Sequence, residues 1–337
     1  MPILDLKNEA LVSKYEDYIK TSPYGHMMQS INWSKVKANW DRDYVYLTDH
    51  EGNITAALSI LSVKNDNLNA FMYAPRGPVC DFYDIDLVTE LLKEADPVIK
   101  QRNGFLLRID PEVIYDAVLV ERYREKGYTL RSREQEDQKT FSNPRNNMIL
   151  DIKDKTEEDV MASFSSKQRT KIRKTYKIDL KTRKVGAGDP LYKETLDRFY
   201  ALTEEMAQRK GITYRPYTYF DNLLHAFENA YMFETYDDEE VLSTSIVVIY
   251  NRKAFYIYAA SSNNKRQCNA SIQTNYEAIK YALTQGAHEY DFGGIFAFDA
   301  NDGLYTFKAN FCGKEGHKEF IGELDLIFNE KLYLDFI

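Results

Sequence analysis

The sequence contains few cysteines, and those present form no recognisable pair. Cys80, Cys268 and Cys312 lie far apart and make no Cys-x-x-Cys unit. A scattered, odd-numbered set argues against a disulfide framework and against a zinc site, and it suits a reducing compartment. The five histidines show no metal-ligand spacing either. We therefore expect no bound metal.

Long apolar runs are absent as well. The chain begins MPILDLKNEALV, which has no basic segment followed by the hydrophobic stretch of a secretory signal peptide. No segment approaches the roughly 20 apolar residues that a membrane-spanning helix requires. These absences lead us to expect a soluble, cytoplasmic protein without a membrane span.

Positive charge is in deficit. The 337 residues include 44 Lys and Arg against 52 Asp and Glu, which gives a formal net charge of −8. This balance argues against a protein coated in nucleic acid, but it is compatible with a local basic patch for one RNA. Hydrophobic residues make up 44% of the chain, so a folded protein with a sizeable core is expected. The length predicts about two domains.

What the sequence does contain is an order of predicted elements that occurs twice. In each half, three strands joined by polar turns are followed by a loop, a helix and a fourth strand. The first copy comprises strands at 43–47, 54–63 and 70–74 with turns at 49–53 and 64–67, a helix at 86–100 closed by Gly104, and a strand at 105–109. The second copy comprises strands at 231–235, 242–250 and 254–260, a helix at 272–284 closed by Gly286, and a strand at 289–292.

This repetition predicts an α/β protein with mixed sheets, built from two related modules. The element order resembles the central part of a GCN5-related N-acetyltransferase (GNAT) module. The polar segment SNPRNN predicts the joint between the modules. We expect the first module to span 1–147 and to be completed by 318–337, and the second to span 148–317. Nothing in the sequence has the long charged heptad pattern of an inserted coiled coil.

The loops that would hold acyl-coenzyme A in a GNAT enzyme have the wrong composition for that task. Such enzymes bind the pyrophosphate with a glycine-rich loop that opens a helix. The corresponding segment of the second module reads RQCNAS and has no glycine, and that of the first reads APRGP, with two prolines that remove N–H donors. An acyl-CoA-dependent N-acyltransferase is therefore kept only as an alternative.

Several short segments follow one another in a specific order. They are SPYG at 22–25, Gln29, WSKVK at 33–37, YAPRGPV at 73–79, LRIDP at 107–111, GITYRP at 211–216, YIYA at 256–259, YDFGGI at 290–295, YTFK at 305–308 and IGE at 321–323. Together they resemble the Fem-type (FemABX) peptidyltransferases over nearly the whole chain. The resemblance is strongest to the compact FemX-like members, which modify UDP-MurNAc-pentapeptide.

This resemblance implies a non-ribosomal aminoacyltransferase of peptidoglycan bridge synthesis. Such an enzyme moves Ala, Ser or Gly from aminoacyl-tRNA to the stem-peptide lysine amine of UDP-MurNAc-pentapeptide or lipid II. It implies aminoacyl-tRNA as co-substrate, with no other cofactor, and we expect a monomer. The first module is expected to bind the precursor, and the second to face the aminoacyl-tRNA.

The resemblance also assigns residues to the precursor. Lys37 and Arg215 match positions that grip its phosphates, and Tyr219 and Tyr258 match positions that contact the same ligand. A diphosphate needs fixed positive charge, and arginine offers a planar fork of donors. The alternatives are solvated surface charges for the two cations and core packing for the two tyrosines. Strand alternation further predicts that Tyr256 and Tyr258 share one face.

Lys308 matches the position at the junction of donor and acceptor, with Phe307 before it as a substrate contact. Transfer from a ribose ester to an amine develops negative charge on oxygen, which a positioned ammonium stabilises. Asp110 is the candidate for holding the incoming amine or taking its proton, and Glu323 is a second acidic candidate. A loop-capping role is the alternative for Asp110. The presence of Lys308 and Asp110 argues against a non-catalytic muropeptide-binding protein, the remaining alternative.

Basic residues are concentrated in one segment. The sequence SSKQRTKIRKTYK at 165–177 predicts a helix with one apolar side. Its cations form the candidate binding surface for the tRNA backbone: Lys167, Arg169, Lys171, Arg173 and Lys174. The alternative is an ordinary solvated helix face.

Overall fold

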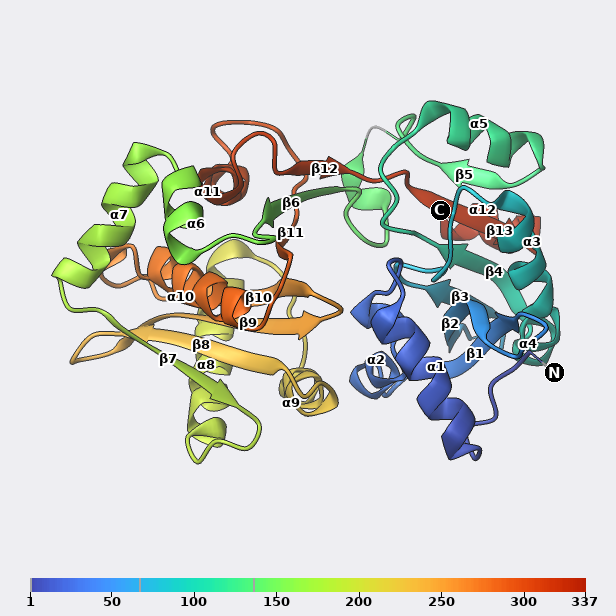
Figure 1. The fold of residues 1–337 in the computed structure, drawn as a ribbon, viewed down its shortest axis with the longest axis horizontal. Helices are drawn as coiled ribbons and strands as arrows, with labels where there is room; N and C mark the ends of the chain where they lie inside the picture. The colour runs from blue at the N-terminus through green and yellow to red at the C-terminus, as the bar shows by residue number, and fades with distance from the viewer. Residues whose placement is uncertain (1, 67, 136) are drawn as a thin grey trace. The chain divides into compact units, whose positions relative to one another are not determined.

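A computed structural model describes residues 2–66, 68–135 and 137–337 of the chain (Figure 1). The chain folds as two compact units. The first comprises the chain up to Asn146 together with Glu319–Ile337, and the second comprises Asn147–Lys318. Each unit has its own sheet and its own buried hydrophobic core.

The sheet of the first unit has the strand order β1-β2-β3-β4-β13-β5. Its strands are β1 (Asp41–Thr48), β2 (Ile54–Lys64), β3 (Ala70–Ala74), β4 (Gly104–Ile109), β5 (Thr129–Arg131) and β13 (Glu323–Ile327). The β3–β4 pair is parallel, whereas β1–β2, β2–β3 and both pairs made by β13 are antiparallel. The last strand of the chain thus lies between β4 and β5, inside the first sheet. The turn expected at 64–67 ends at Asn67, which lies outside the described residues.

Helices surround this sheet. They are α1 (Glu9–Thr21), α2 (Ile31–Val36), α3 (Ile85–Glu94), α4 (Asp96–Arg102), α5 (Ala117–Glu125) and α12 (Glu330–Phe336), with short 3-10 helices η1 (Met27–Gln29) and η2 (Gln138–Thr140). Helix α3 buries Val88, Leu91 and Leu92 in the core of this unit. Apolar residues three or four positions apart lie on one face of a helix, which is why this segment packs as it does.

The single helix expected at 86–100 is in fact two helices. Helix α3 ends at Glu94, and α4 begins at Asp96 with Pro97 in its first turn. Proline has no N–H to bond the carbonyl four residues earlier, so it suits the first turn of a helix and interrupts a helix interior. The expected closure by Gly104 was also wrong. Asn103 ends α4 in the left-handed conformation, with φ of 56°, and Gly104 already begins β4.

Replacement of Asn103 by alanine is expected to destabilise the protein by about 1 kcal/mol. A residue with a Cβ costs roughly 1–2 kcal/mol in the left-handed region, and asparagine tolerates that region better than alanine. The side chain also donates to Asn69 Oδ1 at 3.0 Å. Urea unfolding should show a lower midpoint for Asn103→Ala and little change for the control Asn103→Gly. Equal midpoints for the alanine variant and the wild type would contradict this.

The sheet of the second unit has the strand order β12-β6-β11-β10-β9-β8-β7. Its strands are β6 (Asn146–Asp151), β7 (Lys181–Gly186), β8 (Ala230–Tyr236), β9 (Val241–Tyr250), β10 (Lys253–Ser261), β11 (Glu289–Gly294) and β12 (His317–Glu319). The β10–β11 pair is parallel, and β7–β8, β8–β9, β9–β10 and β6–β11 are antiparallel. Both units therefore contain a mixed sheet, as the expected α/β class requires.

The helices of the second unit lie on both faces of its sheet. They are α6 (Glu157–Ser163), α7 (Ser166–Lys177), α8 (Tyr192–Lys210), α9 (Tyr217–Ala226), α10 (Ala270–Thr284) and α11 (Gly303–Cys312), with the 3-10 helix η3 (Arg266–Cys268). Figure 1 shows α10 in front of the sheet and α8 behind it. Among the described residues α8 is the longest helix, at 19 residues, and no helix there has the length and apolar character to cross a bilayer.

Strands β10 and β11 diverge soon after they meet. Their parallel register runs only from Lys253–Phe255 on β10 to Glu289–Asp291 on β11. Beyond it, β10 continues to Ser261 and β11 to Gly294. The divergence opens the sheet at the end where α10 begins, and a cavity lies at this opening.

Candidate active site

The second unit contains a cavity of about 890 Å³ where β10 and β11 diverge. Its walls come from the end of α8, the start of α10, the two diverging strands and α11. The lining includes Arg209, Lys210, Tyr256, Ile257, Ser271, Phe292, Gly293, Gly294, Asp302, Phe307 and Lys308. Two of the predicted site residues, Phe307 and Lys308, thus share one cavity.

Lys308 is buried in the wall of this cavity, with 5% of its surface exposed. Its Nζ donates a hydrogen bond to the carbonyl oxygen of Gly294 at 2.7 Å. Burial lowers the pKa of Lys308 to about 8, and the nearby Asp291 carboxylate opposes that shift. The side chain is therefore an ammonium at neutral pH, and its remaining N–H groups are suited to an oxygen that gains negative charge.

The Gly293–Gly294 segment adjoins the ammonium. Gly293 has φ of 75°, a conformation that residues with a Cβ rarely adopt. A Cβ at this position would stand 3.7 Å from Lys308 Nζ, so the segment packs directly against the ammonium. Asp291 holds the turn, because its Oδ1 accepts from Gly293 N at 2.7 Å and its Oδ2 lies 3.2 Å from Lys253 Nζ.

Three residues assigned to the precursor lie together in the second unit. The guanidinium carbon of Arg215 is 5.5 Å from the centre of the Tyr219 ring. The Tyr258 hydroxyl donates to the Tyr219 hydroxyl at 3.2 Å. Burial raises the pKa of Tyr219, so this hydroxyl stays neutral. Arg215 is exposed in the loop before α9, where a guanidinium supported by an aromatic ring is available to an anion.

Lys37, the fourth residue assigned to the precursor, belongs to the first unit. It caps the C-terminal end of α2, and its Nζ lies 5.9 Å from the centre of the Trp40 ring. The side chain is half-buried. It is therefore positioned by the same kind of aromatic contact as Arg215.

The expectation that Tyr256 and Tyr258 share one face was wrong. A β-bulge lies between them, opposite β9, and the extra residue of a bulge breaks the alternation of side chains. Tyr256 packs on Phe292 and lines the Lys308 cavity. Tyr258 instead packs on Tyr219 and Phe220 of α9.

Asp110 lies at the end of β4 in the first unit and is 3% exposed. Its Oδ1 accepts from the backbone N–H of Arg76 at 2.6 Å, and its Oδ2 accepts from the Tyr73 hydroxyl at 2.8 Å and Asn143 Nδ2 at 2.9 Å. Burial raises the pKa of the Asp110 carboxyl, and the Arg76 guanidinium opposes that shift. Three of about four acceptor positions on this carboxylate are thus occupied by its own unit.

Glu323 belongs to a buried ionic cluster on β4, β5 and β13. Its Oε2 is 2.7 Å from Arg131 Nη1 and 3.3 Å from Arg108 Nη1. Arg108 also forms a two-bond pair with Asp325, both bonds at 2.7 Å. Burial raises the pKa of Glu323 to about 7 against the influence of the arginines. These contacts favour a role in joining the strands.

The basic segment forms helix α7, as the periodicity predicts. Lys167, Arg173 and Lys174 are exposed, and Lys171 is half-buried. Arg169 differs from them, because its guanidinium donates to the carbonyl oxygens of Ala162 and Phe164 at the end of α6. It therefore caps α6, whereas the other cations of α7 face solvent or its border.

Arg209 and Lys210 line the Lys308 cavity, although they were not singled out from the sequence. They end α8 directly before Gly211, which closes the helix with φ of 62°. The sequence signal that could have identified them is their position as a pair of cations immediately before the GITYRP segment. Their charge is suited to a ligand that carries phosphate.

The residues described, 2–66, 68–135 and 137–337, contain no group of three His, Cys, Asp or Glu side chains arranged to hold a metal ion. The functional groups of the Lys308 cavity are the Lys308 and Lys210 ammonium groups, the Arg209 guanidinium and aromatic rings. These groups are suited to binding a phosphate-bearing substrate and to stabilising an oxyanion.

Comparison with known proteins identifies relatives over the full chain. The model of the FemAB family matches residues 11–235 and 228–335. The UDP-N-acetylmuramoylpentapeptide-lysine N(6)-alanyltransferase of Weissella viridescens is 35% identical over 343 aligned residues, which cover 100% of this chain and 99% of that protein. A lipid II:glycine glycyltransferase of Staphylococcus epidermidis is 25% identical, over 95% of this chain and 92% of that protein.

Solved structures share the fold. A crystal structure of FemX matches with a TM-score of 0.85 at 22% identity, over 99% of each chain. A tandem GNAT protein from the clavulanic acid biosynthesis pathway matches with a TM-score of 0.55 at 10% identity, over 96% of this chain and 97% of that one. The expected fold of two tandem GNAT-like modules is thereby confirmed. The match of the family model to most of the chain, together with 35% identity over its full length, shows that this chain belongs to the FemAB family.

Proposed function

We propose that this chain is an aminoacyltransferase of peptidoglycan bridge synthesis. It transfers an amino acid from aminoacyl-tRNA to the ε-amine of the stem-peptide lysine in a peptidoglycan precursor. The observation that carries this proposal is the buried Lys308 ammonium beside Gly294, in the cavity where β10 and β11 diverge. The printed names of the two relatives, an alanyltransferase and a glycyltransferase, support the reaction type.

The chemistry requires one bond to form and one to break. The lysine nitrogen attacks the carbonyl carbon of the tRNA ester, the bond from that carbon to the ribose oxygen breaks, and a proton of the amine passes to the ribose oxygen, which becomes a hydroxyl. Negative charge develops first on the carbonyl oxygen and then on the leaving oxygen. Lys308 stabilises both, as a fixed cation does in a site sheltered from water, and Phe307 contacts the substrate. The ester is already activated, so the reaction consumes no ATP.

Alanine is the proposed donor residue and UDP-MurNAc-pentapeptide the proposed acceptor. The support is the Weissella relative, which is 35% identical over the whole chain and is named for both. The glycyltransferase relative is named for lipid II, which makes glycine and the lipid-linked precursor the second choice. Aminoacyl-tRNA is a cytoplasmic molecule, so we assign the protein to the cytoplasm.

The precursor's phosphates are proposed to bind Arg215 and Lys37, with Tyr219 and Tyr258 supporting Arg215. The cations Arg209 and Lys210 and the exposed face of α7 are proposed to bind the tRNA. A cation that neutralises a phosphate releases a counterion, so binding at these positions is expected to weaken as salt is added.

Asp110 is proposed to orient the lysine amine. Its own unit leaves about one acceptor position on the carboxylate, which suits a single hydrogen bond from the amine. Glu323 is not proposed to contact the amine, because its carboxylate already pairs with Arg108 and Arg131 and accepts from the Ser142 backbone N–H.

The proposal is tested by mixing purified protein with UDP-MurNAc-pentapeptide and tRNA charged with alanine, serine or glycine in turn. Mass spectrometry should detect the precursor carrying one added alanyl residue, with slower addition of the other two amino acids. If none of the three charged tRNAs yields an adduct, with either the nucleotide-linked or the lipid-linked precursor, the proposal fails.

A thermal-shift assay alongside the transfer experiment separates the two alternatives. A non-catalytic muropeptide-binding protein would bind the precursor in a thermal-shift assay without forming an adduct. An acyl-CoA-dependent enzyme would be stabilised by coenzyme A. Binding of coenzyme A is disfavoured by the segment before α10. There, η3 and Asn269 precede the helix in place of the glycines that bind a pyrophosphate.

A further inference from the structure

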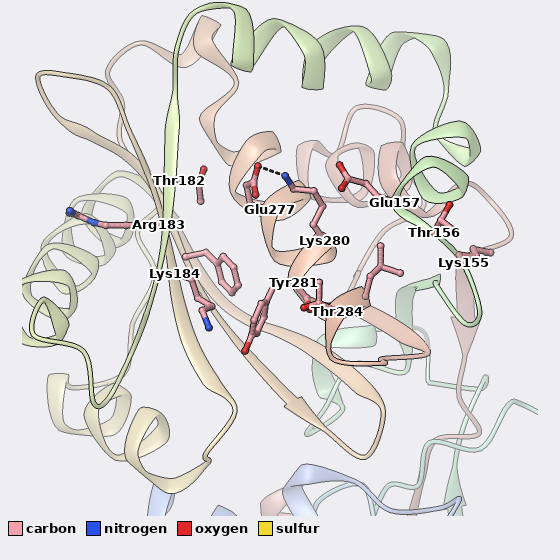
Figure 2. Close-up of a pocket in the computed structure, with 12 residues that line it drawn as sticks. Lys155, Thr156, Glu157, Thr182, Arg183, Lys184, Glu277, Lys280, Tyr281 and Thr284 are labelled. Atoms are coloured by element: carbon pink, nitrogen blue, oxygen red, sulfur yellow. Dashed lines mark hydrogen bonds and ion pairs between the residues drawn. The ribbon is translucent and has the colours of Figure 1, made fainter.

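The second unit contains another cavity, of about 580 Å³, between β7 and α10 (Figure 2). Its lining comes from four elements: Lys155–Glu157 at the start of α6, Thr182–Lys184 on β7, Phe233 on β8, and residues of the second half of α10 between Glu277 and Thr284. None of its lining residues lines the Lys308 cavity. We refer to it as the β7–α10 groove, and none of the roles proposed above uses it.

Most charged groups of the β7–α10 groove are already paired. Lys280 lies 2.8 Å from the Glu277 carboxylate, and Lys155 lies 3.3 Å from that of Asp151. Arg183 bonds to Glu234, and Figure 2 shows its side chain directed away from the other labelled residues. Pairs of this kind offer little free charge to a ligand.

Lys184 is different. Its Nζ lies 4.1 Å from the centre of the Tyr231 ring and 4.0 Å from that of the Tyr281 ring. Figure 2 shows Lys184 of β7 and Tyr281 of α10 directed toward each other. Within the part of the chain that the structure describes, no carboxylate pairs with this ammonium. Two aromatic faces hold the cation in place and leave its charge available for an anion.

The two carboxylates that line the groove are engaged elsewhere, which reduces their repulsion of an anion. The Tyr276 hydroxyl donates to Glu157 Oε1 at 2.9 Å. Glu277 accepts from the Tyr176 hydroxyl and pairs with Lys280. Grooves that bind single-stranded nucleic acid combine cations for the backbone with aromatic side chains, and Lys184 with Tyr231 and Tyr281 supplies both.

One side of α7 borders the groove. Tyr176 of α7 bonds to Glu277, and its ring centre lies 5.7 Å from Lys280 Nζ, so α7 touches two of the α10 residues that line the groove. Arg173 stands three residues before Tyr176 and therefore lies on the same side of α7, whereas Lys167, Lys171 and Lys174 share the other side. Arg173 is exposed, so this side of α7 carries a cation that belongs to the same unit as Lys184.

The distance along α10 fits the same ligand as the Lys308 cavity. Ser271 lines that cavity and Lys280 lines the groove, nine residues later on one helix. At 1.5 Å per residue this separation along the helix axis is about 14 Å, and the two residues face opposite sides of the helix. A stacked strand rises about 3.4 Å per nucleotide, so at least about four nucleotides are needed to span it. A strand whose 3′ end lies at Lys308 would therefore meet the groove several nucleotides before that end.

We propose that the β7–α10 groove binds the backbone of the donor tRNA a few nucleotides before its charged 3′ end, with Lys184 contacting a phosphate. This inference rests on the proposed function, because it takes tRNA as the donor. The group bound would be a ribose phosphate of RNA. A free nucleotide carries the same group, and the experiment below distinguishes the two ligands.

The test is the affinity of the full-length protein for uncharged tRNA over a range of KCl concentrations. The variant Lys184→Met keeps an apolar stem over the two rings and removes the charge. Its affinity for tRNA should be about 3- to 10-fold weaker at low salt, and its plot of log affinity against log salt should be shallower by about one. Affinity for UDP-MurNAc-pentapeptide should stay unchanged.

A matched control removes one positive charge elsewhere in the same unit. Lys193→Met has the same change of charge on α8, where Lys193 pairs with Asp197. This control should leave both the affinity for tRNA and the salt slope at the wild-type values. Tyr281→Leu provides a second variant, because loss of one supporting ring should weaken tRNA binding while the cation stays.

The outcomes separate this inference from the proposed function. If the wild type transfers an aminoacyl group but Lys184→Met has the same tRNA affinity and salt slope, the inference is wrong and the proposed function stands. If the wild type binds no tRNA at all, both fail. If Lys184→Met loses stabilisation by AMP but keeps its tRNA affinity, the groove binds a free nucleotide and the inference is overturned.

Discussion

Replacement of Lys308 by alanine is expected to slow aminoacyl transfer by about 10²- to 10³-fold, the usual effect of removing one oxyanion-stabilising donor. The ammonium lies 2.7 Å from the Gly294 carbonyl and faces the cavity, so its loss removes charge from the reacting region without removing a precursor contact. Single-turnover transfer from alanyl-tRNA measures the effect. The precursor's Kd should remain within about twofold of the wild-type value.

The pH dependence of transfer gives a second signature of Lys308. Burial lowers its pKa to about 8, so the side chain is charged below that pH and loses its proton as the pH rises through it. A role that needs the ammonium therefore weakens above pH 8. The acceptor amine, in contrast, becomes more reactive as pH rises. The variant Lys308→Arg stays charged, so the ratio of wild-type to variant rate should fall above pH 8.

Two results would contradict the assignment of Lys308. One is transfer by Lys308→Ala at a rate within threefold of the wild type. The other is a ratio of wild-type to Lys308→Arg rate that rises above pH 8, which would indicate that the neutral amine acts as a base. Lys314→Ala is the control for loss of a lysine near α11, because Lys314 is exposed just beyond the helix.

Loss of precursor binding is the second large effect expected. Arg215→Ala should raise the Kd for UDP-MurNAc-pentapeptide by about 10- to 100-fold, the range expected for loss of charge-assisted hydrogen bonds to a phosphate. Lys37→Ala should have a smaller effect, about 10-fold, because an ammonium offers a point charge and no planar fork. Isothermal titration in low and moderate salt measures both variants.

Matched variants make this test specific. Lys35→Ala removes a neighbouring cation of α2 whose Nζ donates to Asn32, and it should bind the precursor normally. Arg215→Lys should retain part of the affinity, since the charge remains and the planar fork is lost. Full affinity in both Arg215→Ala and Lys37→Ala would show that these residues are solvated surface charges, the alternative that the sequence left open.

Much of the fold could be predicted because periodicity and turn residues act locally. Strand β3 begins and ends at the predicted residues, and β2 extends only one residue further. The break between α3 and α4 was missed because the apolar spacing continues through it. The signal was Pro97, whose missing N–H interrupts the helix although the apolar face is uninterrupted.

The candidate site was harder to predict, since it depends on departures from regular structure. The bulge between Tyr256 and Tyr258 directs the two side chains to different surroundings, and a sequence without Gly or Pro at that point does not reveal it. The carbonyl that accepts the Lys308 hydrogen bond is a backbone group, which no residue type indicates. Arg209 and Lys210 reach the cavity only because α8 ends beside the diverging strands.

Asp110 illustrates the limit of motif reasoning. Its place after a strand and before a proline suits both a catalytic carboxylate and a loop cap. In the structure it bonds to the Arg76 backbone N–H, as a loop cap does, and it also remains close to Tyr73 and Asn143 in a buried site. The sequence around a catalytic carboxylate and around a loop-capping carboxylate can be the same. Only the hydrogen-bond partners of the carboxylate in the structure distinguish the two roles.

The most direct test of the account compares two acceptors in one transfer assay. Wild-type protein and alanyl-tRNA are incubated with UDP-MurNAc-pentapeptide whose stem-peptide lysine has either a free or an acetylated ε-amine, and the products are sequenced by tandem mass spectrometry. We expect one alanyl residue on the free ε-amine and none on the acetylated precursor. Alanine on another position, or equal transfer to both precursors, would contradict it.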